Sequence, residues 1–256
     1  MTDAALAPGV PPDYYDRIAE VENRHWWHLG MRKITESLLG ELLERPGQRL
    51  LDAGCGTGGF LRWALDRGAF ASAAGIDIAG AAIELARQRA PEADLRIGSL
   101  RELPFGDAAF DLVVTTDVVQ HVPIDELDTS LSELYRVLAP GGTLLVRTNG
   151  ARRRREERHD WRAFDRSSLS AALEDAGFAC ERVTYANALL SLLAAPSKRT
   201  PHAPDETSHG LPEARSGRLK SAVGLRVLSA EARWLSRPGR TLPFGHTLFA
   251  VAKRSA

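Results

Sequence analysis

Leu50-Leu51-Asp52-Ala53-Gly54-Cys55-Gly56-Thr57-Gly58-Gly59 is the stretch that decides the fold, because a short apolar run there passes into a cluster of glycines. Glycines at such a turn let the backbone approach a ligand at the amino end of a helix, where unpaired amide groups point outwards. The stretch therefore predicts a strand, a ligand-binding loop and a helix, in that order.

Apolar runs and helical patterns alternate on both sides of this loop. The predicted strands are 49–53, 73–78, 94–97, 110–115, 142–148, 179–185 and 246–253. The predicted helices between them are 59–67, 81–90, 125–138 and 167–175. Such alternation is typical of an α/β fold with a mostly parallel sheet, here of seven strands, and helices on both faces.

The remaining segments suggest a division of the chain into parts. Its boundaries are a flexible arm at 1–12, a helical N-terminal cap at 13–47, a core at 48–185, a helical insertion or lid at 186–240 with a mobile segment at 197–218, and a final strand and tail at 241–256. In the cap, helical patterning is expected up to residue 43, where Pro46 and Gly47 follow. In the insertion, 219–235 reads as a helix with Val223, Val227, Ala230 and Trp234 as its buried stripe.

Composition narrows the classes of function. The 256 residues carry 33 Lys and Arg against 33 Asp and Glu, a balance that argues against a general nucleic-acid binder. Two cysteines are too few for a disulfide framework, and the longest apolar stretch, 186–196, is too short to cross a bilayer. The N-terminus lacks a signal-peptide pattern. We expect a cytoplasmic protein without stable membrane insertion, a monomer or homodimer that binds no nucleic acid.

Two interpretations of the glycine loop compete. Gly54, Gly56 and Gly59 satisfy the G-x-G-x-x-G pattern of dinucleotide-binding folds. Asp52, however, comes just before the first glycine, and a carboxylate there would repel a diphosphate and attract a cationic ligand. Asp52 could instead cap a helix.

Four motifs and a fifth strand region, in a fixed order, carry a family resemblance. The segment 52–58, Gly75-Ile76-Asp77-Ile78, the loop 98–105 and the strand regions 110–122 and 138–146 resemble the motifs of class I S-adenosylmethionine-dependent methyltransferases, of the type 11-like group. The resemblance covers about 13–185 and 246–253. It implies a Rossmann-like fold and S-adenosylmethionine as cofactor, with a sulfonium that suits Asp52 and an amino-acid tail that suits backbone amides around Gly54 and Gly56.

The resemblance also implies a set of cofactor contacts. They are Asp52, Ala53, Gly54, Cys55, Gly56, Gly58, Asp77, Ile78, Ser99, Leu100, Asp117, Trp27 and Arg32. In the family, the acidic residue at Asp77 takes both ribose hydroxyls. Ser99 departs from the pattern, because many relatives have an aspartate there that binds the adenine amino group, so the adenine contact is expected from Ser99 or from the backbone of Leu100.

The segment Glu22-Asn23-Arg24-His25-Trp26-Trp27-His28 resembles a subset of these enzymes with Glu-x-x-His-Trp-Trp ahead of an arginine, here Arg32. In that group the segment caps the cofactor, so a tryptophan could offer its ring to the sulfonium and Arg32 could pair with the methionine carboxylate. Both tryptophans could equally pack the first helix on the sheet. His25 and His28 stand three residues apart but lack further metal ligands nearby, so we expect no metal.

Methyl transfer is an in-line displacement that depends largely on alignment and exclusion of water. A base is needed only if the acceptor must lose a proton, and the candidates are His121 and His25. His121 could instead bond a backbone group in its loop. We expect O-, N- or C-methylation of a small-molecule or lipid-like acceptor, in secondary-metabolite or glycan biosynthesis. The alternatives are a non-methylating reaction such as cyclisation, or an NAD-dependent dehydrogenase.

Overall fold

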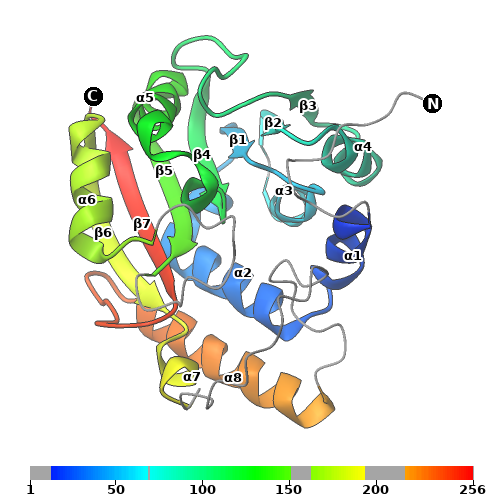
Figure 1. Ribbon diagram of the computed structural model, residues 1–256, viewed down its shortest axis with the longest axis vertical. Helices are drawn as coiled ribbons and strands as arrows, with labels where there is room; N and C mark the ends of the chain where they lie inside the picture. The colour runs from blue at the N-terminus through cyan, green and yellow to red at the C-terminus, as the bar shows by residue number, and fades with distance from the viewer. Residues whose placement is uncertain (1–12, 69, 151–162, 194–216, 256) are drawn as a thin grey trace.

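The computed structural model describes residues 13–68, 70–150, 163–193 and 217–255, and within them forms a seven-stranded sheet of order β3-β2-β1-β4-β5-β7-β6 (Figure 1). The strands are β1 (Arg49–Ala53), β2 (Ser72–Asp77), β3 (Asp94–Ile97), β4 (Phe110–Thr116), β5 (Leu138–Asn149), β6 (Phe178–Ala186) and β7 (Thr247–Arg254). The helices are α1 (Tyr14–Val21), α2 (Trp26–Leu39), α3 (Gly59–Leu65), α4 (Gly80–Arg89), α5 (Leu127–Val137), α6 (Arg166–Asp175), α7 (Ala188–Leu193) and α8 (Arg218–Leu235), with 3₁₀ turns η1 (Gly40–Leu43), η2 (Val119–His121) and η3 (Ile124–Glu126).

Strands β1 to β5 run parallel, and β7 runs antiparallel between β5 and β6. The prediction of a mostly parallel seven-stranded sheet is therefore confirmed. The predicted arm at 1–12 and nearly all of the predicted mobile segment at 197–218 lie outside the described residues, and the division into parts stays a prediction.

Helices cover both faces of the sheet. Successive strand residues alternate between the faces, so Leu50 and Leu145 pack with α2, α3, α4 and α8, whereas Leu51 and Leu144 pack with α5 and α6. Figure 1 shows α2 and α8 side by side. No helix in the described ranges is both long enough and apolar enough to cross a bilayer.

The segment predicted as an N-terminal cap, 13–47, contains α1, α2 and η1. Helix α2 ends earlier than predicted, because Gly40 adopts a φ of 55° and its amide bonds back to the carbonyl of Glu36, which is a typical way to close a helix. Only the 3₁₀ turn η1 continues to Leu43.

The predicted buried stripe of α8 is wrong. Val223 is 45% and Trp234 is 39% exposed, whereas the buried side of the helix is shifted by one residue along the chain. That side consists of Gly224, Leu228, Glu231, Ala232 and Leu235. The cause is α2: a side chain at Gly224 would meet the ring of Trp26, and one at Gly30 would meet Leu228. Two glycines thus let the helices approach closely.

Candidate functional site

The glycine loop follows β1 at the carboxyl edge of the parallel strands, where open α/β sheets bind ligands. Gly54, Gly56 and Gly58 all have positive φ, of 88°, 51° and 78°, a conformation that favours glycine. The side chain of Val118 occupies the space beside Gly54, whereas nothing lies within 4 Å of the position a Cβ would take at Gly56. The loop therefore leaves open room at Gly56.

The loop amides already have acceptors within the protein. The amides of Gly54 and Cys55 donate to the carbonyl of Ile76 at 2.8 and 2.9 Å, and the amide of Gly56 donates to Asp77 Oδ2 at 2.9 Å. These three amides are therefore paired within the protein, and the expectation that amides around Gly54 and Gly56 suit a ligand tail stays a prediction. These bonds fix the loop to the end of β2.

Asp52 is the unusual group of the site. Its side chain is fully buried within β1, and neither carboxylate oxygen has a hydrogen-bond partner among the described residues. Burial, reinforced by nearby Asp77 and opposed by Arg147, raises the pKa of Asp52 to about 7. It caps no helix, since the N-cap of α3 is Gly58. A buried, unpaired carboxylate is costly and indicates a ligand that brings a donor or a positive charge.

Asp77 lies beside Asp52 at the end of β2. Its two oxygens accept hydrogen bonds from the amides of Gly56 and Ala79, each at 2.9 Å, and burial raises its pKa despite these bonds. A carboxylate can accept about four hydrogen bonds, so Asp77 keeps capacity for a hydroxyl donor.

An apolar and weakly polar surface adjoins Asp77. Ile78 is 57% and Ile97 59% exposed, although both are large apolar residues. Ser99 Oγ accepts a hydrogen bond from the amide of Arg101 at 3.3 Å, which leaves its own O–H to donate, and Leu100 is buried. This combination suits a flat ring with a polar edge.

The first turn of α2 and the ends of β4 and β5 bring four side chains together. Arg147 pairs with Asp117 at 2.5 Å, and its guanidinium lies 5.3 Å from the centroid of the Trp27 ring. His28 packs edge-on against Trp27 at 5.0 Å between ring centroids. Asp117 has a φ of 60°, an uncommon conformation outside glycine.

The sheet register places this group over the same face as Asp52. Asp52 pairs with Val114, and two residues further Thr116 pairs with Arg147. Residues two apart on a strand share a face, and Val114 packs in the core beneath α2. Arg147 therefore faces α2, as Asp52 does, and links the carboxylate to the aromatic group.

His28 was not predicted as a site residue. Its Nε2 is buried without a hydrogen-bond partner among the described residues, and burial together with the positive charge of Arg147 lowers its pKa to about 3. The imidazole is therefore neutral at physiological pH. In the sequence, His28 stands out only because it follows the two tryptophans, and this position does not distinguish a buried imidazole from a surface one.

His25 and Arg32 have structural partners. His25 is the N-cap of α2, and its Nδ1 accepts a hydrogen bond from the amide of Trp27 at 3.3 Å. In the neutral ring the proton is then on Nε2, so His25 would have to give up the cap to act as a base through Nδ1. Arg32 donates to the carbonyl of Gly59 at 2.9 Å and to Asn23 Oδ1 at 2.8 Å, which joins α2 to the start of α3.

Glu22 is a second residue that sequence reasoning left without a role. Its carboxylate accepts a hydrogen bond from Thr57 Oγ1 at 2.5 Å and forms an ion pair with Arg89 of α4. It also fills the space above Gly59 where a Cβ would lie. The N-terminal segment thus holds the glycine loop from outside.

The other predicted residues lie around the same edge. His121 is exposed in η2, directly after β4, and the neighbouring Gln120 is held by Thr148 Oγ1 and the amide of Asn149 at 2.9 and 3.2 Å. Ala53 and Cys55 are buried, and burial raises the pKa of the Cys55 thiol well above its usual range.

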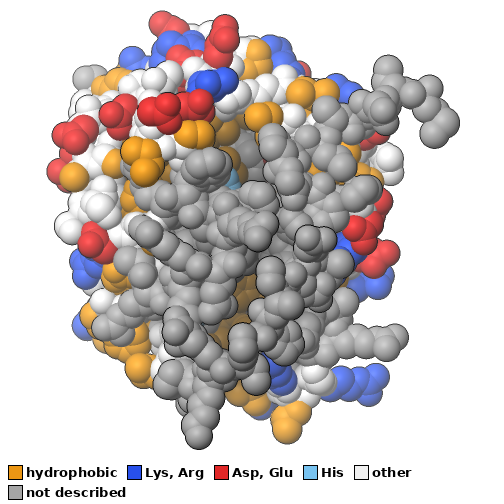
Figure 2. Space-filling view, viewed as in Figure 1, with side chains coloured by type: hydrophobic (Ala, Val, Ile, Leu, Met, Phe, Trp, Pro, Cys, Tyr) orange, Lys and Arg blue, Asp and Glu red, His pale blue; other side chains and the backbone are white. Residues whose placement is uncertain are grey.

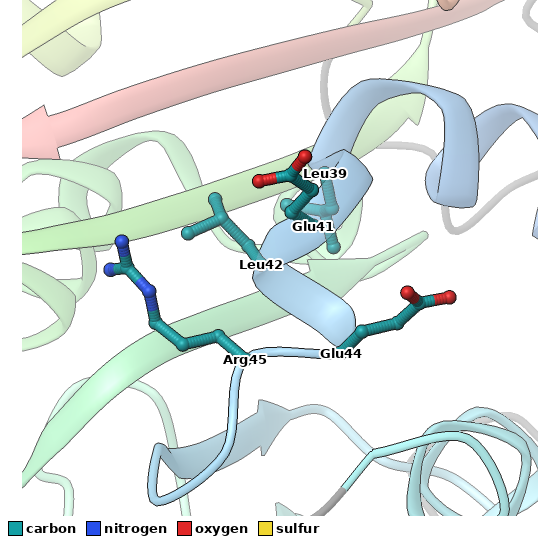
Figure 3. Close-up of a pocket in the computed structure, with 5 residues that line it drawn as sticks. All are labelled: Leu39, Glu41, Leu42, Glu44 and Arg45. Carbon is teal, nitrogen blue, oxygen red and sulfur yellow. The ribbon is translucent and has the colours of Figure 1, made fainter.

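Two negative findings limit the site. Across the described residues, no group of three or more His, Cys, Asp or Glu side chains is placed to hold a metal ion. The pocket of Figure 3, lined by Leu39, Glu41, Leu42, Glu44 and Arg45, lies at η1 before β1 begins. It is therefore at the opposite end of β1 from the glycine loop.

Comparison with known proteins identifies the family. A model of the methyltransferase domain matches residues 51–146. A probable S-adenosylmethionine-dependent methyltransferase of Mycolicibacterium smegmatis is 34% identical over 185 residues, which cover 70% of this chain and 69% of that protein. The chain belongs to the S-adenosylmethionine-dependent methyltransferase family.

Other members of the family agree with this assignment. A malonyl-[acyl-carrier protein] O-methyltransferase of Serratia marcescens is 39% identical over 134 residues, 52% of this chain and 51% of that enzyme. The chain spans about half the length of the first curated relatives it matches. Phosphoethanolamine N-methyltransferase 2 of Haemonchus contortus, solved with S-adenosylmethionine, has the same fold, with a TM-score of 0.63 at 17% identity over 96% of this chain and 58% of that one. The cofactor of the family is S-adenosylmethionine, as the motifs implied, and membership disfavours the dehydrogenase alternative.

Proposed function

We propose that this protein transfers the methyl group of S-adenosylmethionine to an O, N or C atom of a small-molecule or lipid-like acceptor. The pathway we propose is secondary-metabolite or glycan biosynthesis. The acceptor class is supported by the names of its relatives, which act on a malonyl-[acyl-carrier protein] and on phosphoethanolamine. We further propose that it acts in the cytoplasm as a monomer or homodimer without a nucleic-acid partner.

The unpaired carboxylate of Asp52 carries the proposal. When bound, the cofactor supplies an electrophilic methyl group on a positively charged sulfur. Asp52 would bind the positively charged part of this ligand and so gain the partner that it lacks within the protein. Because a nearby cation favours the ionised form, ligand binding would lower the raised pKa of Asp52.

The neighbouring strand ends would hold the rest of the cofactor. Asp77 would accept hydrogen bonds from the ribose hydroxyls, while Ile78 packs against the adenine ring and Ser99 or the Leu100 backbone contacts its polar edge. The open space at Gly56 gives the ligand access to the loop. Arg32, which donates a hydrogen bond to the carbonyl of Gly59, would pair with the methionine carboxylate.

The aromatic group would lie where the cofactor meets the acceptor, with Trp27 and Asp117 as the cofactor contacts that the resemblance implies and His28 on the acceptor side. Trp27 and the neutral His28 exclude water, and the pair of Arg147 and Asp117 fixes the polar wall beside them. If the acceptor must lose a proton, His121 is the candidate that takes it, because it is exposed at this edge while His25 serves as a helix cap. In-line displacement then requires mainly alignment.

Two measurements test the proposal. Calorimetry should show that S-adenosylmethionine and S-adenosylhomocysteine both bind, and the absence of binding by both would refute it. Incubation with a library of small and lipid-like acceptors should then release S-adenosylhomocysteine. Cofactor binding with no such release from any acceptor would favour a non-methylating reaction such as cyclisation. A thermal shift with NAD but none with S-adenosylmethionine would favour the dehydrogenase.

A further inference from the structure

The side of α8 that faces away from α2 carries apolar and basic side chains together. We define the outer face of α8 as Leu219, Val223, Arg226, Arg233 and Trp234. Its apolar members are 79%, 45% and 39% exposed, and both arginines are exposed. Their spacing of three, four, seven or eight residues places them on one side of a helix. Figure 2 shows hydrophobic and basic side chains next to one another at the lower rim, over the beginning of α8.

The charge of this helix is one-sided. Its basic residues are Arg218, Lys220, Arg226 and Arg233, and its one acidic residue is Glu231. Glu231 is only 3% exposed and accepts hydrogen bonds from the amides of Asn187 and Leu189, at 2.7 and 3.0 Å, at the start of α7. The negative charge of Glu231 is therefore turned inwards, and the charged side chains of the outer face as defined, Arg226 and Arg233, are both positive.

The next turn continues the pattern. Arg237 and Arg240 follow the helix and are exposed, and the guanidinium of Arg240 lies 4.5 Å from the centroid of the Trp234 ring. The indole N–H of Trp234 donates to the carbonyl of Thr241 at 3.4 Å. The end of α8 thus holds an exposed tryptophan among arginines.

We propose that the outer face of α8 docks on a membrane surface rich in anionic lipids. The arginines would bind lipid phosphates, Leu219 and Val223 would enter the acyl boundary, and Trp234 would lie at headgroup depth. Basic and apolar side chains on one face match such a surface, because it offers negative charge above hydrocarbon.

Docking needs no rearrangement of the fold. The opposite side of α8 stays packed on α2, where Trp26 lies against Gly224 and Leu228 against Gly30. Trp26 directly precedes Trp27 and His28 of the candidate acceptor side, so the docked surface lies one helix away from it. Membrane docking does not depend on methyl transfer, but docking would bring the candidate site close to a lipid-like acceptor.

Vesicle co-sedimentation of the full chain tests the inference. The protein should sediment with vesicles that contain phosphatidylglycerol, remain in solution with phosphatidylcholine alone, and be released by high salt. Arg226→Glu with Arg233→Glu should weaken binding at least about tenfold. The matched control is Arg45→Glu with Arg166→Glu, which makes the same change of charge at exposed positions outside α8 and should reduce binding much less.

Leu219→Ser tests the apolar part separately. Because Leu219 is 79% exposed, the substitution leaves the core intact, and it should weaken vesicle binding severalfold while cofactor affinity stays unchanged. Equal sedimentation of the wild type and the double arginine variant would overturn the inference. So would failure of the wild type to bind anionic vesicles, or a dimer in light scattering that the arginine variant disrupts, since a second copy would then cover this face.

Discussion

The glycine loop after β1 and the helix α8 both depend on glycines, but for different reasons. Gly54, Gly56 and Gly58 are required by their own backbone, because each has a positive φ. Gly224 lies in a regular helix, and a glycine is needed there because the ring of Trp26 occupies the space that a side chain at position 224 would take. The first requirement is local and readable in the sequence. The second exists only when α2 is already packed on α8.

The largest effect is expected from Glu22→Ala, which tests whether the loop is held only by its own sequence. The change leaves Arg89 without its ion-pair partner and Thr57 without its acceptor, and should lower the free energy of unfolding by about 3–5 kcal/mol. Urea unfolding measures it. Glu20→Ala is the control, because Glu20 is exposed in α1, directly before the Glu22 position that caps this helix. Equal losses in both variants would mean that the loop needs no clamp from outside.

Asp52→Asn tests whether the buried carboxylate serves a ligand. Loss of the charge should weaken binding of S-adenosylmethionine in calorimetry by about 2–3 kcal/mol, while exposed Asp128→Asn leaves it unchanged. Unchanged cofactor affinity in Asp52→Asn would show that the carboxylate has a structural role only.

The raised pKa of Asp52 also predicts that the stability of the ligand-free protein depends on pH, and Asp52→Asn tests this. Because the pKa of Asp52 in the folded protein, about 7, lies above the value of 3.8 expected in the unfolded chain, its contribution to stability is fully present below about pH 4 and is lost as the pH rises to about 7. Thermal melts should show this decline in the wild type and a smaller one in Asp52→Asn. Parallel pH profiles would contradict the raised pKa.

Gly224→Val tests whether the close packing of α8 on α2 requires a glycine at position 224. A side chain there would overlap the ring of Trp26, and forcing the helices apart should cost about 1–3 kcal/mol in urea unfolding. Ala222→Val is the matched control, because residue 222 lies two positions earlier on the same helix and is exposed. Similar losses for both would mean that the helices separate without cost.

The smallest effect is expected from Val223→Ala, which separates the predicted face of α8 from the observed one. Because Val223 is 45% exposed, its substitution should change the free energy of unfolding by less than about 0.5 kcal/mol. Leu228 is fully buried, so Leu228→Ala should lower the free energy of unfolding by about 2–5 kcal/mol. The apolar stripe predicted from the sequence gives the opposite order, so the reverse result would restore it.

Much of the fold follows from the pattern of residues along the chain. Strands β1 and β3 were predicted at 49–53 and 94–97 and lie at Arg49–Ala53 and Asp94–Ile97, and the other strands differ from prediction by a few residues at their ends. Alternation and apolar runs are properties of a few neighbouring residues, so they survive without tertiary information. The face of α8 could not be predicted in this way, because the regular stripe of Val223, Val227, Ala230 and Trp234 is not the buried side: Val227 is half-buried and the other three are exposed.

The site was predictable to a similar degree. The sequence singled out Asp52 and Asp77, and the structure brings them to one edge of the sheet with a raised pKa in each. It did not reveal that the loop amides are already paired, or that Arg32 joins α2 to Gly59. Partners of this kind lie far apart in the chain, so no local pattern records them.

The sequence by itself determined the order of strands and helices, the turn that needs glycines, the family and its cofactor, because each of these rests on backbone conformation or motif order within short segments. The tertiary structure alone decided which side of α8 is buried, that Glu22 holds the loop, and that His28 lies beside Arg147 without a partner for its Nε2. The physical reason is that burial and pairing depend on which distant surfaces meet, and that is settled only when the helices pack on the sheet.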